Sequence, residues 1–298
     1  MNRLPEFLQK SPGQWTRRDV LKASAASVTA IGLGALGIGC AVRQWVEVSH
    51  VEVKLRDLPQ AFDGLTIAQL TDIHHGFYTG LDYIHRCVEI VNSLQPDVIV
   101  LTGDFTYGGQ KYVGPCAEVL SGLRAKAGTY AVLGNHDYYV GASSVATALK
   151  TAGCAMLIDG LDRLELRGEK LWLAGTDDLY YGTTDIKQLL RDIPRDTPRI
   201  VLAHNPDFIE EFAAKDQRVD LMISGHTHGG QIRFPLAGAP HVSSAYGQQY
   251  IIGLNRKDKM QIYTSRGIGT VFLPTRVDCP PEIALITLKS SESAAIGS

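Results

Sequence analysis

Short apolar runs alternate with segments of helical periodicity along the chain beyond residue 45. Between residues 81 and 94 the apolar side chains recur every three or four positions and stop before Pro96, which predicts an amphipathic helix. The same reasoning predicts helices over 114–124, 143–151 and 184–191, and a short helix after Pro206, a residue favoured in the first turn. Apolar runs predict strands over 46–55, 65–71, 97–102, 129–133, 199–203 and 219–224, a meander over 155–158, 162–167 and 170–175, and late strands near 249–253, 260–264 and 283–288.

The order of these elements indicates the fold class. Strands that alternate with helices favour an α/β core, and the meander favours mixed rather than purely parallel sheets. No internal repeat and no low-complexity linker interrupts residues 46–289, so we expect one catalytic domain there. The small polar residues from 290 to 298 predict a disordered tail.

The first 45 residues differ from the rest of the chain and predict a targeting segment. Arg17-Arg18 precede an apolar pair and a lysine, which resembles a twin-arginine export signal. Residues 23–42 follow without a charge and are rich in Gly and Ala, which suits such a signal. The run is also long enough for a membrane anchor, and Cys40 ends a sequence similar to a lipoprotein box. Cleaved signal, retained anchor and lipidation at Cys40 therefore all remain open.

Charge and cysteine content exclude several functions. The chain has 298 residues and a net charge of −2, but residues 1–43 carry +4 and the remainder −6. An acidic body behind a basic leader points to targeting and against nucleic-acid binding. Five cysteines without paired spacing argue against a disulfide framework and a zinc-thiolate site.

Polar residues able to bind metal follow five of the predicted strands. Because ligands of open α/β sheets bind at the carboxyl ends of strands, we expect these side chains to converge. Imidazoles, carboxylates and one amide without a thiolate suit Mn, Fe or Zn. The residues concerned are Asp72, His74, Asp104, Asn135, His136, His204, His226 and His228. Three other histidines, His50, His85 and His241, are expected at the surface.

The ordered series D-x-H, G-D, G-N-H-D, H and G-H-x-H resembles the calcineurin-like metallophosphoesterase family over about residues 65–230. Gly229-Gly230-Gln231-Ile232 and the segment 265–270 (SRGIGT) are similar to the small bacterial members, some of them twin-arginine exported. The resemblance implies a four-layer αββα sandwich, in which two mixed sheets are flanked by helices. It also implies two divalent metal ions per chain.

The resemblance further implies a role for each ligand. Asp72, His74 and His228 would hold the first metal, Asn135, His204 and His226 the second, and Asp104 would bridge both. A hydroxide between the metals would attack phosphorus, and His136 would assist the leaving group as the catalytic residue. Alternate residues of an extended 225–228 segment would point to one side and bring both histidines to the cluster.

The sequence departs from the protein phosphatases of this kind, which carry Gly-Asp-x-x-Asp-Arg-Gly. The chain reads GDFTYGG from residue 103, so the second Asp and the phosphate-binding Arg are missing. This disfavours a phosphoprotein substrate. Asp137 is a candidate partner of His136, and Arg266 a candidate phosphate contact. Tyr107, Tyr138 and Tyr139 are expected to line a substrate groove or to face solvent as loop residues.

These observations predict a two-metal phosphodiesterase acting on small or lipid-linked phosphate esters at the cell envelope. The alternatives are a UDP-2,3-diacylglucosamine-type pyrophosphatase and, from another class, a non-catalytic metal-stabilised binding module. The expected partners are the twin-arginine export machinery and, through the N-terminal segment, the membrane. The expected location is the periplasm or the outer face of the cytoplasmic membrane.

Overall fold

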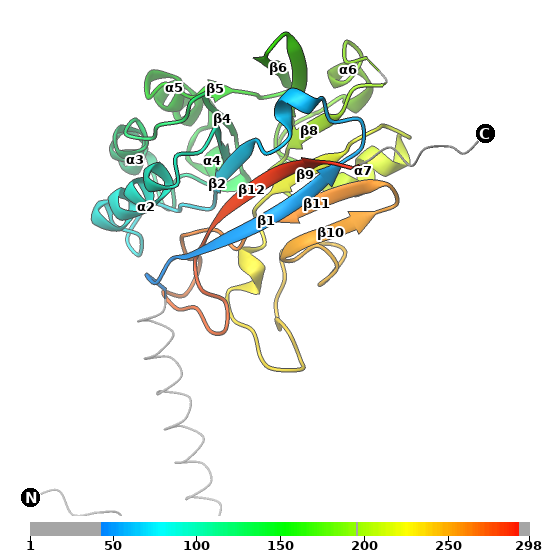
Figure 1. Cartoon of the computed structure of the whole chain (residues 1–298). Helices are drawn as coiled ribbons and strands as arrows, with labels where there is room; N and C mark the ends of the chain where they lie inside the picture. The colour runs from blue at the N-terminus through cyan, green and yellow to red at the C-terminus, as the bar shows by residue number, and fades with distance from the viewer. Residues whose placement is uncertain (1–42, 195, 292–298) are drawn as a thin grey trace, which may run out of the picture.

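The computed structural model describes residues 43–194 and 196–291, in which two six-stranded sheets lie face to face (Figure 1). The first sheet has the order β1-β12-β2-β3-β4-β5. Its strands are β1 (Glu47–Leu55), β2 (Thr66–Leu70), β3 (Val98–Thr102), β4 (Thr129–Val132), β5 (Ala155–Met156) and β12 (Glu282–Ser290). The second sheet has the order β10-β11-β9-β8-β7-β6. Its strands are β6 (Gly160–Leu166), β7 (Glu169–Gly175), β8 (Arg199–Leu202), β9 (Leu221–Ser224), β10 (Gly253–Lys257) and β11 (Met260–Thr264).

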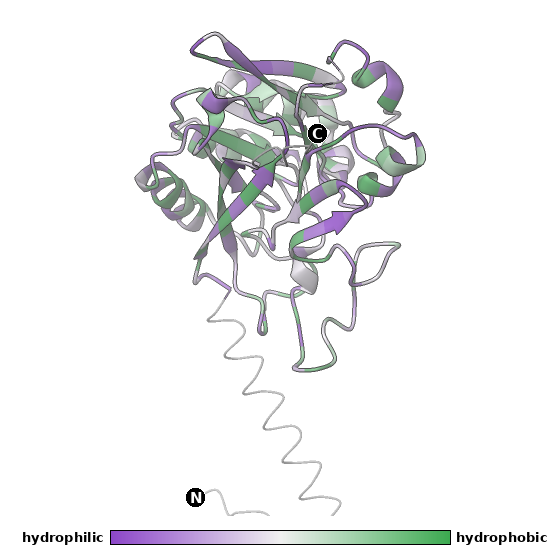
Figure 2. Ribbon diagram, turned by 45° about the vertical axis from the view of Figure 1, so that its right-hand side comes forward, coloured by the Kyte–Doolittle hydropathy of each residue, from purple (hydrophilic) through white to green (hydrophobic). Residues whose placement is uncertain are grey.

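Helices cover the outer face of each sheet and complete four layers. The helices α2 (Leu81–Ser93), α3 (Val113–Leu120) and α5 (Ala142–Thr151) pack on the first sheet, and α6 (Ile186–Leu189) and α7 (Phe208–Ala214) on the second. In Figure 2 these helices carry both hydrophobic and hydrophilic residues, as amphipathic helices do. The expected α/β fold, an αββα sandwich of two mixed sheets, is confirmed.

The core between the sheets explains the continuous apolar runs of the sequence. All five residues of β3 and all four of both β8 and β9 are buried, because each strand has a packed layer on both faces. Strands β2, β3 and β4 run parallel in one sheet, and β7, β8, β9 and β11 in the other. Their carboxyl ends therefore open toward one end of the molecule.

Several predicted elements differ from the observed ones. The meander is wrong, because β5 pairs with β4 in the first sheet whereas β6 and β7 form a hairpin in the second. The helix predicted over 184–191 is the single turn α6, and the strand predicted over 249–253 is found at β10. Helix α4 (Asn135–Val140) and the 3-10 turns η3 (Gln60–Phe62), η4 (Gln110–Tyr112) and η5 (His228–Gly230) had no sequence signal strong enough to predict them.

The targeting segment falls largely outside the described part of the chain, which begins at residue 43, and so does the tail beyond residue 291. Within the described ranges, no helix combines the length and the hydrophobicity needed to cross a bilayer. The four cysteines in these ranges, Cys87, Cys116, Cys154 and Cys279, are buried free thiols, as expected for small apolar residues.

Candidate metal centre

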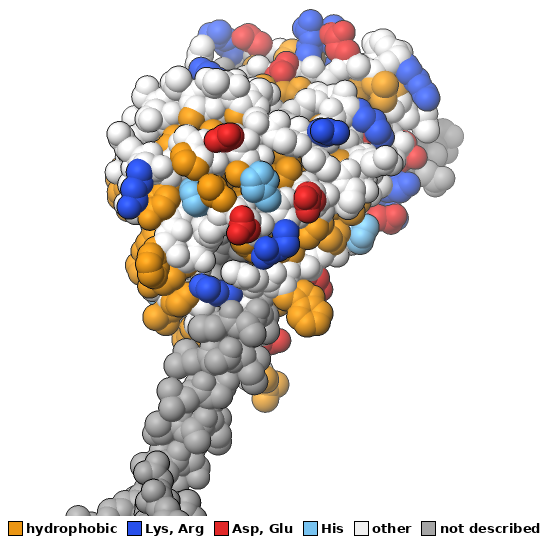
Figure 3. Space-filling view, turned by 90° about the vertical axis from the view of Figure 1, so that its left-hand side faces the viewer, with side chains coloured by type: hydrophobic (Ala, Val, Ile, Leu, Met, Phe, Trp, Pro, Cys, Tyr) orange, Lys and Arg blue, Asp and Glu red, His pale blue; other side chains and the backbone are white. Residues whose placement is uncertain are grey.

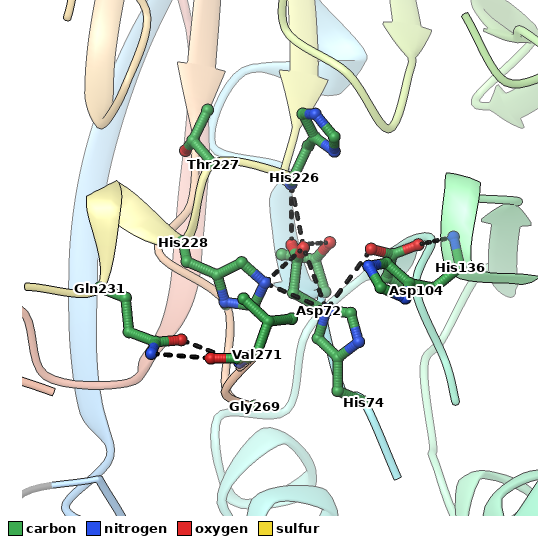
Figure 4. Close-up of polar contacts among 12 residues, drawn as sticks. Asp72, His74, Asp104, His136, His226, Thr227, His228, Gln231, Gly269 and Val271 are labelled. Carbon is green, nitrogen blue, oxygen red and sulfur yellow. Dashed lines mark hydrogen bonds and ion pairs between the residues drawn. The ribbon is translucent and has the colours of Figure 1, made fainter. Parts of the chain in front are cut away.

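The structure brings the seven expected ligands together at the carboxyl ends of five strands. Asp72 and His74 follow β2, Asp104 follows β3, and Asn135 begins α4 just after β4. His204 follows β8, and both His226 and His228 follow β9. All seven side chains are buried. Figure 4 shows Asp72, His74, Asp104 and His228 pointing toward one another from the segments after β2, β3 and β9.

One group of ligand atoms is formed by Asp72, His74 and His228. The Nε2 atoms of His74 and His228 are 3.0 Å apart. Oδ1 of Asp72 lies 3.4 Å from Nε2 of His228 and 3.9 Å from Nε2 of His74. Two segments that are 154 residues apart in the sequence therefore meet at one point.

A second group is formed by Asp104, His204 and His226, with Asn135 beside them. Nε2 of His204 lies 3.2 Å from Oδ1 of Asn135 and 3.1 Å from Nδ1 of His226. Oδ2 of Asp104 lies 3.3 Å from Nε2 of His204 and also 3.4 Å from Nε2 of His74. The single oxygen of Asp104 therefore borders both groups.

These separations fit metal coordination. Ligands bound at about 2.0–2.2 Å from one metal ion lie about 3–3.5 Å from each other. Burial lowers the pKa of His74 and of His226 to about 3, so both imidazoles are neutral and offer a lone pair. A buried cluster of lone pairs and carboxylates is costly unless a cation compensates it.

Without a bound cation, the pKa of His204 shifts in the direction opposite to those of His74 and His226. Burial disfavours its charged form, but the adjacent Asp104 carboxylate outweighs burial and raises the pKa of His204 to about 10. A divalent cation at this position would displace that proton, because metal ligands bind through the deprotonated nitrogen. The donor set present thus fits a divalent metal such as Mn, Fe or Zn.

The backbone of the ligand residues is unusual. Asp72, His74, Asp104, His226 and His228 all have positive φ, between 49° and 69°. This left-handed conformation is uncommon for residues with a side chain, and it is found most often at functional sites. The segment 225–228 is therefore not extended, contrary to our expectation. His226 and His228 reach the cluster through two left-handed residues rather than by strand alternation.

Hydrogen bonds orient the two carboxylates. The His226 N–H donates to both oxygens of Asp72, at 3.1 and 3.0 Å, and the Thr71 hydroxyl donates to Oδ2 at 2.8 Å. The His136 N–H donates to Oδ1 of Asp104 at 2.9 Å, which leaves Oδ2 directed at His74 and His204 (Figure 4). Such contacts from outside the ligand set fix the direction of the metal-binding oxygens.

His136 lies at the edge of the cluster and is half-buried. Its ring is edge-on to that of His74, with centroids 4.8 Å apart. Tyr107 and Tyr139 flank His136 at 5.3 and 5.4 Å, and Tyr180 lies 5.9 Å from His226. Of the three expected tyrosines, Tyr107 and Tyr139 thus border the cluster.

Tyr138 turns to another partner. It donates to Asp177 and stacks on Tyr181, whose hydroxyl in turn donates to that of Tyr139 at 2.8 Å. Tyr139 and Tyr181 remain exposed. The tyrosines therefore form an aromatic rim on one side of the ligand cluster.

Asp137 does not contact His136, and our interpretation of it was wrong. Its carboxylate accepts the backbone N–H groups of Asp104, Phe105 and Gly134, each at 2.9 Å. The residue therefore fixes the turn that presents Asp104. Since Asp137 is the third residue of α4, its carboxylate is directed back at the helix N-terminus and not toward the imidazole.

Arg266, the candidate phosphate contact, has two acidic partners in the fold. Its guanidinium is paired with Glu47 at 2.9 Å and Glu282 at 3.3 Å. The fully buried Arg276, for which the sequence analysis had no signal, contacts one of the ligands. Its Nη2 is 3.4 Å from Nδ1 of His228 and donates to the carbonyls of Arg266 and Gly269 at 2.8 and 2.6 Å.

Fold and site together define a metal-dependent hydrolase, with polar ligands gathered at the strand ends of a two-sheet α/β sandwich. Comparison with known proteins identifies the family. The profile of calcineurin-like phosphoesterases matches residues 65–230, more than half of the chain. The chain belongs to this family and is a metal-dependent phosphoester hydrolase.

Three curated relatives illustrate the similarity. The uncharacterized metallophosphoesterase YkuE of Bacillus subtilis is 34% identical over 288 residues, covering 93% of this chain and 98% of the relative. Phosphodiesterase YaeI of Escherichia coli is 32% identical over 278 residues, covering 92% and 99%. A transmembrane protein with a metallophosphoesterase domain from Danio rerio is 32% identical, covering 82% of this chain and 58% of that protein.

Proposed function

We propose that the protein is a phosphodiesterase that uses two divalent metal ions, Mn, Fe or Zn, to cleave small or lipid-linked phosphate esters at the cell envelope. The observation that carries this proposal is the position of Asp104 Oδ2, 3.4 Å from His74 and 3.3 Å from His204. One oxygen between two imidazole groups suits a carboxylate that bridges two cations.

Each of the two ligand groups would bind one metal ion. Asp72, His74 and His228 would hold one ion, and Asn135, His204 and His226 the other. When bound, two such ions acidify a water molecule between them and offset the negative charge of the phosphate. The protein supplies the fixed geometry, which the left-handed ligand residues and the hydrogen bonds to both carboxylates maintain.

His136 is placed to act on the leaving group. Burial lowers its pKa, and its backbone N–H is held by Asp104. Its ring contacts those of His74 and of the rim tyrosines Tyr107 and Tyr139. A side chain in this position would bind the substrate and assist the departing oxygen, as a proton donor or, in the neutral form that burial favours, as a hydrogen-bond donor that stabilises its charge.

Two features favour a diester over a phosphoprotein. The loop after β3 lacks the second Asp and the Arg of protein phosphatases, and Phe105 and Tyr107 occupy that loop. The aromatic rim suits an organic group on the second ester oxygen better than a doubly charged monoester. The curated name of the Escherichia coli relative, a phosphodiesterase, supports the same choice.

Hydrolysis of bis-p-nitrophenyl phosphate by the full chain, with Mn added and bound metal counted by elemental analysis, tests the function. We expect two ions per chain, and loss of both turnover and metal in Asp104→Ala. We expect His136→Gln to keep its metal but lose about 100-fold or more in turnover. The exposed His85→Ala is the matched control. Retained metal without turnover in the native chain would indicate a binding module instead.

The location at the envelope rests on the N-terminal sequence. Arg17-Arg18 and the uncharged residues 23–42 support twin-arginine export, and the name of the Danio rerio relative associates this domain with membranes. Replacing both arginines by lysine should leave the protein inside the cell. Export that is unchanged in that variant would contradict the proposal.

A further inference from the structure

Large apolar side chains are exposed to solvent on loops at one end of the molecule. The four most exposed of them within the described residues are Leu236 at 110%, Phe77 at 87%, Trp45 at 76% and Phe272 at 70% of full exposure. Phe234 and Leu273 accompany them at 51% each. We call these six side chains the apolar loop surface. Isolated exposed leucines are ordinary, but this concentration of aromatic and aliphatic side chains marks an interaction site.

The loops that carry this surface are fastened to one another. The side-chain amide of Gln231 donates to the carbonyls of Val271 and Leu273, both at 3.0 Å, and accepts the Val271 N–H at 2.9 Å (Figure 4). The loops 231–238 and 271–275 are therefore one unit. Tyr83 Oη donates to the carbonyl of Ile268 at 3.0 Å and connects this unit to α2 and the Phe77 loop before it.

Two residues of the apolar loop surface have a strained backbone. Leu236 and Phe272 adopt positive φ, 68° and 56°. This conformation is unfavourable for large apolar residues, and exposure of these side chains to water adds a further cost. No packing inside the described fold compensates either cost, because both side chains are exposed. An apolar partner outside the chain would cover both side chains and so compensate the cost of their exposure to water.

The apolar loop surface lies at the end of the molecule where the described part of the chain begins. Strand β1 begins there, and Glu47 on it pairs with Arg266, just before the 267–275 loop. Both long loops extend toward this end in Figure 1, and Figure 3 shows hydrophobic side chains on either side of the junction. The 20 preceding residues, 23–42, carry no charge and are long enough to cross the hydrocarbon core of a bilayer.

We propose that the apolar loop surface docks on a lipid bilayer. Trp and Phe are the side chains favoured at the membrane–water interface, and leucines on projecting loops insert readily beside them. Docking in this orientation presents the ligand cluster to the headgroups, because Gln231 lies three residues after His228 and Arg276 links His228 to the same loops. Given the proposed function, a lipid-linked phosphate would reach the site from the membrane.

A polarity-sensitive fluorophore on a single introduced cysteine tests the docking in the full chain. Leu236→Cys and Phe272→Cys report on the surface, and Leu166→Cys is the matched control. Leu166 is also an exposed leucine, but it lies at the β6–β7 turn, at the opposite ends of the strands. The background carries Cys40→Ala, since the four described cysteines are buried.

With liposomes of phosphatidylethanolamine and phosphatidylglycerol, we expect a blue shift at positions 236 and 272 and quenching there by lipids with brominated acyl chains. Position 166 should not respond. Vesicle binding without a response at 236 and 272 would show that the N-terminal segment alone holds the protein, and would overturn the proposal. A blue shift without lipid that grows with protein concentration would identify a second copy as the partner, and would also overturn it.

A second measurement separates docking from catalysis. The double variant Leu236→Ser/Phe272→Ser should hydrolyse soluble bis-p-nitrophenyl phosphate at the native rate. Its response to vesicles, measured as the lipid concentration needed for half-maximal quenching of a probe at residue 77 (Phe77→Cys), should weaken by roughly 100-fold. If the native chain did not hydrolyse soluble bis-p-nitrophenyl phosphate, only the proposed function would be refuted. If the double variant needed the same lipid concentration for half-maximal quenching as the native chain, only the docking would be refuted.

Discussion

The carboxylate of Asp137 accepts the backbone N–H of Asp104 at 2.9 Å, and so connects the start of α4 to the turn after β3. The same carboxylate accepts the N–H groups of Phe105 and Gly134. A residue next to His136 in the sequence thus acts on the geometry of Asp104, the ligand that borders both groups.

Replacing Asp137 with Asn should destabilise this turn. The amide would direct an NH₂ group at a backbone donor and leave at least one buried N–H without an acceptor, at a cost of about 1–3 kcal/mol. Urea unfolding measures this loss, and Mn titration should show weaker binding. Asp258→Asn is the control, because Asp258 is in a left-handed turn that Asn also tolerates. Unchanged unfolding of Asp137→Asn would contradict the role assigned to Asp137.

A methyl group at residue 225 should displace a ligand. The Cβ of Gly225→Ala would collide with Oδ2 of Asp72 and Oγ1 of Thr71. We expect metal affinity to fall by roughly 10–100-fold, as for other changes beside a ligand. Gly114→Ala, where a Cβ meets nothing within 4 Å in α3, should instead stabilise the protein by roughly 0.5–1 kcal/mol. If Gly225→Ala and Gly114→Ala bound metal with equal affinity, displacement of Asp72 by the new Cβ would be excluded.

Removal of the buried guanidinium should weaken the fold near His228. Arg276 donates to the carbonyls of Arg266, Gly267, Gly269 and Cys279. Arg276→Met leaves the carbonyls of Arg266, Gly269 and Cys279 without this donor, at about 1–3 kcal/mol for each group that water does not reach, whereas Gly267 keeps the N–H of Glu282. Thermal unfolding should show a large drop, whereas the exposed Arg163→Met should remain within roughly 0.5 kcal/mol of the native chain. A small effect at Arg276 would mean that water satisfies these carbonyls.

Acid should destabilise the protein partly through Glu282. Burial opposes ionisation of this carboxyl, but the Arg266 guanidinium outweighs burial and holds the pKa of Glu282 below its usual 4.5. A depressed folded-state pKa contributes stability above pH 4.5 that is lost as the pH falls through the lower value. Glu282→Gln should therefore be less stable than the native chain at pH 7.

The stability difference between Glu282→Gln and the native chain should shrink below pH 4.5. Urea unfolding of both proteins at pH 7, 5 and 4 measures this difference, and bound metal affects both alike. A difference that stays constant over this range would show that Glu282 contributes no ionisation-dependent stability.

The sequence predicted the site better than it predicted the details of the fold. Asp72, Asp104 and His204 could be found because each follows a buried apolar run, and parallel strands bring their carboxyl ends to one edge. The left-handed backbone of the ligand residues could not be foreseen, since Asp and His carry no glycine-like signal for it. Cluster geometry overrides local preference at these positions.

Roles that depend on long-range contacts were also beyond the sequence. Arg266 and Arg276 are ten residues apart, and only the fold shows that one pairs with Glu47 and Glu282 while the other lies beneath His228. The periodicity of 155–158 and 162–167 predicted strands, but not that β5 and β6 belong to different sheets. Short apolar segments specify an extended conformation and not their partner.

Strand β12 has a consequence for how the protein is made. It lies between β1 and β2, and within the described residues it is the only strand that pairs with β1. The ribosome synthesises Glu47–Leu55 well before Glu282–Ser290, a delay of roughly ten seconds to a minute at about 5–20 residues per second. Throughout that interval β1 and one edge of β2 are unpaired, so nascent chains need protection from aggregation until translation ends.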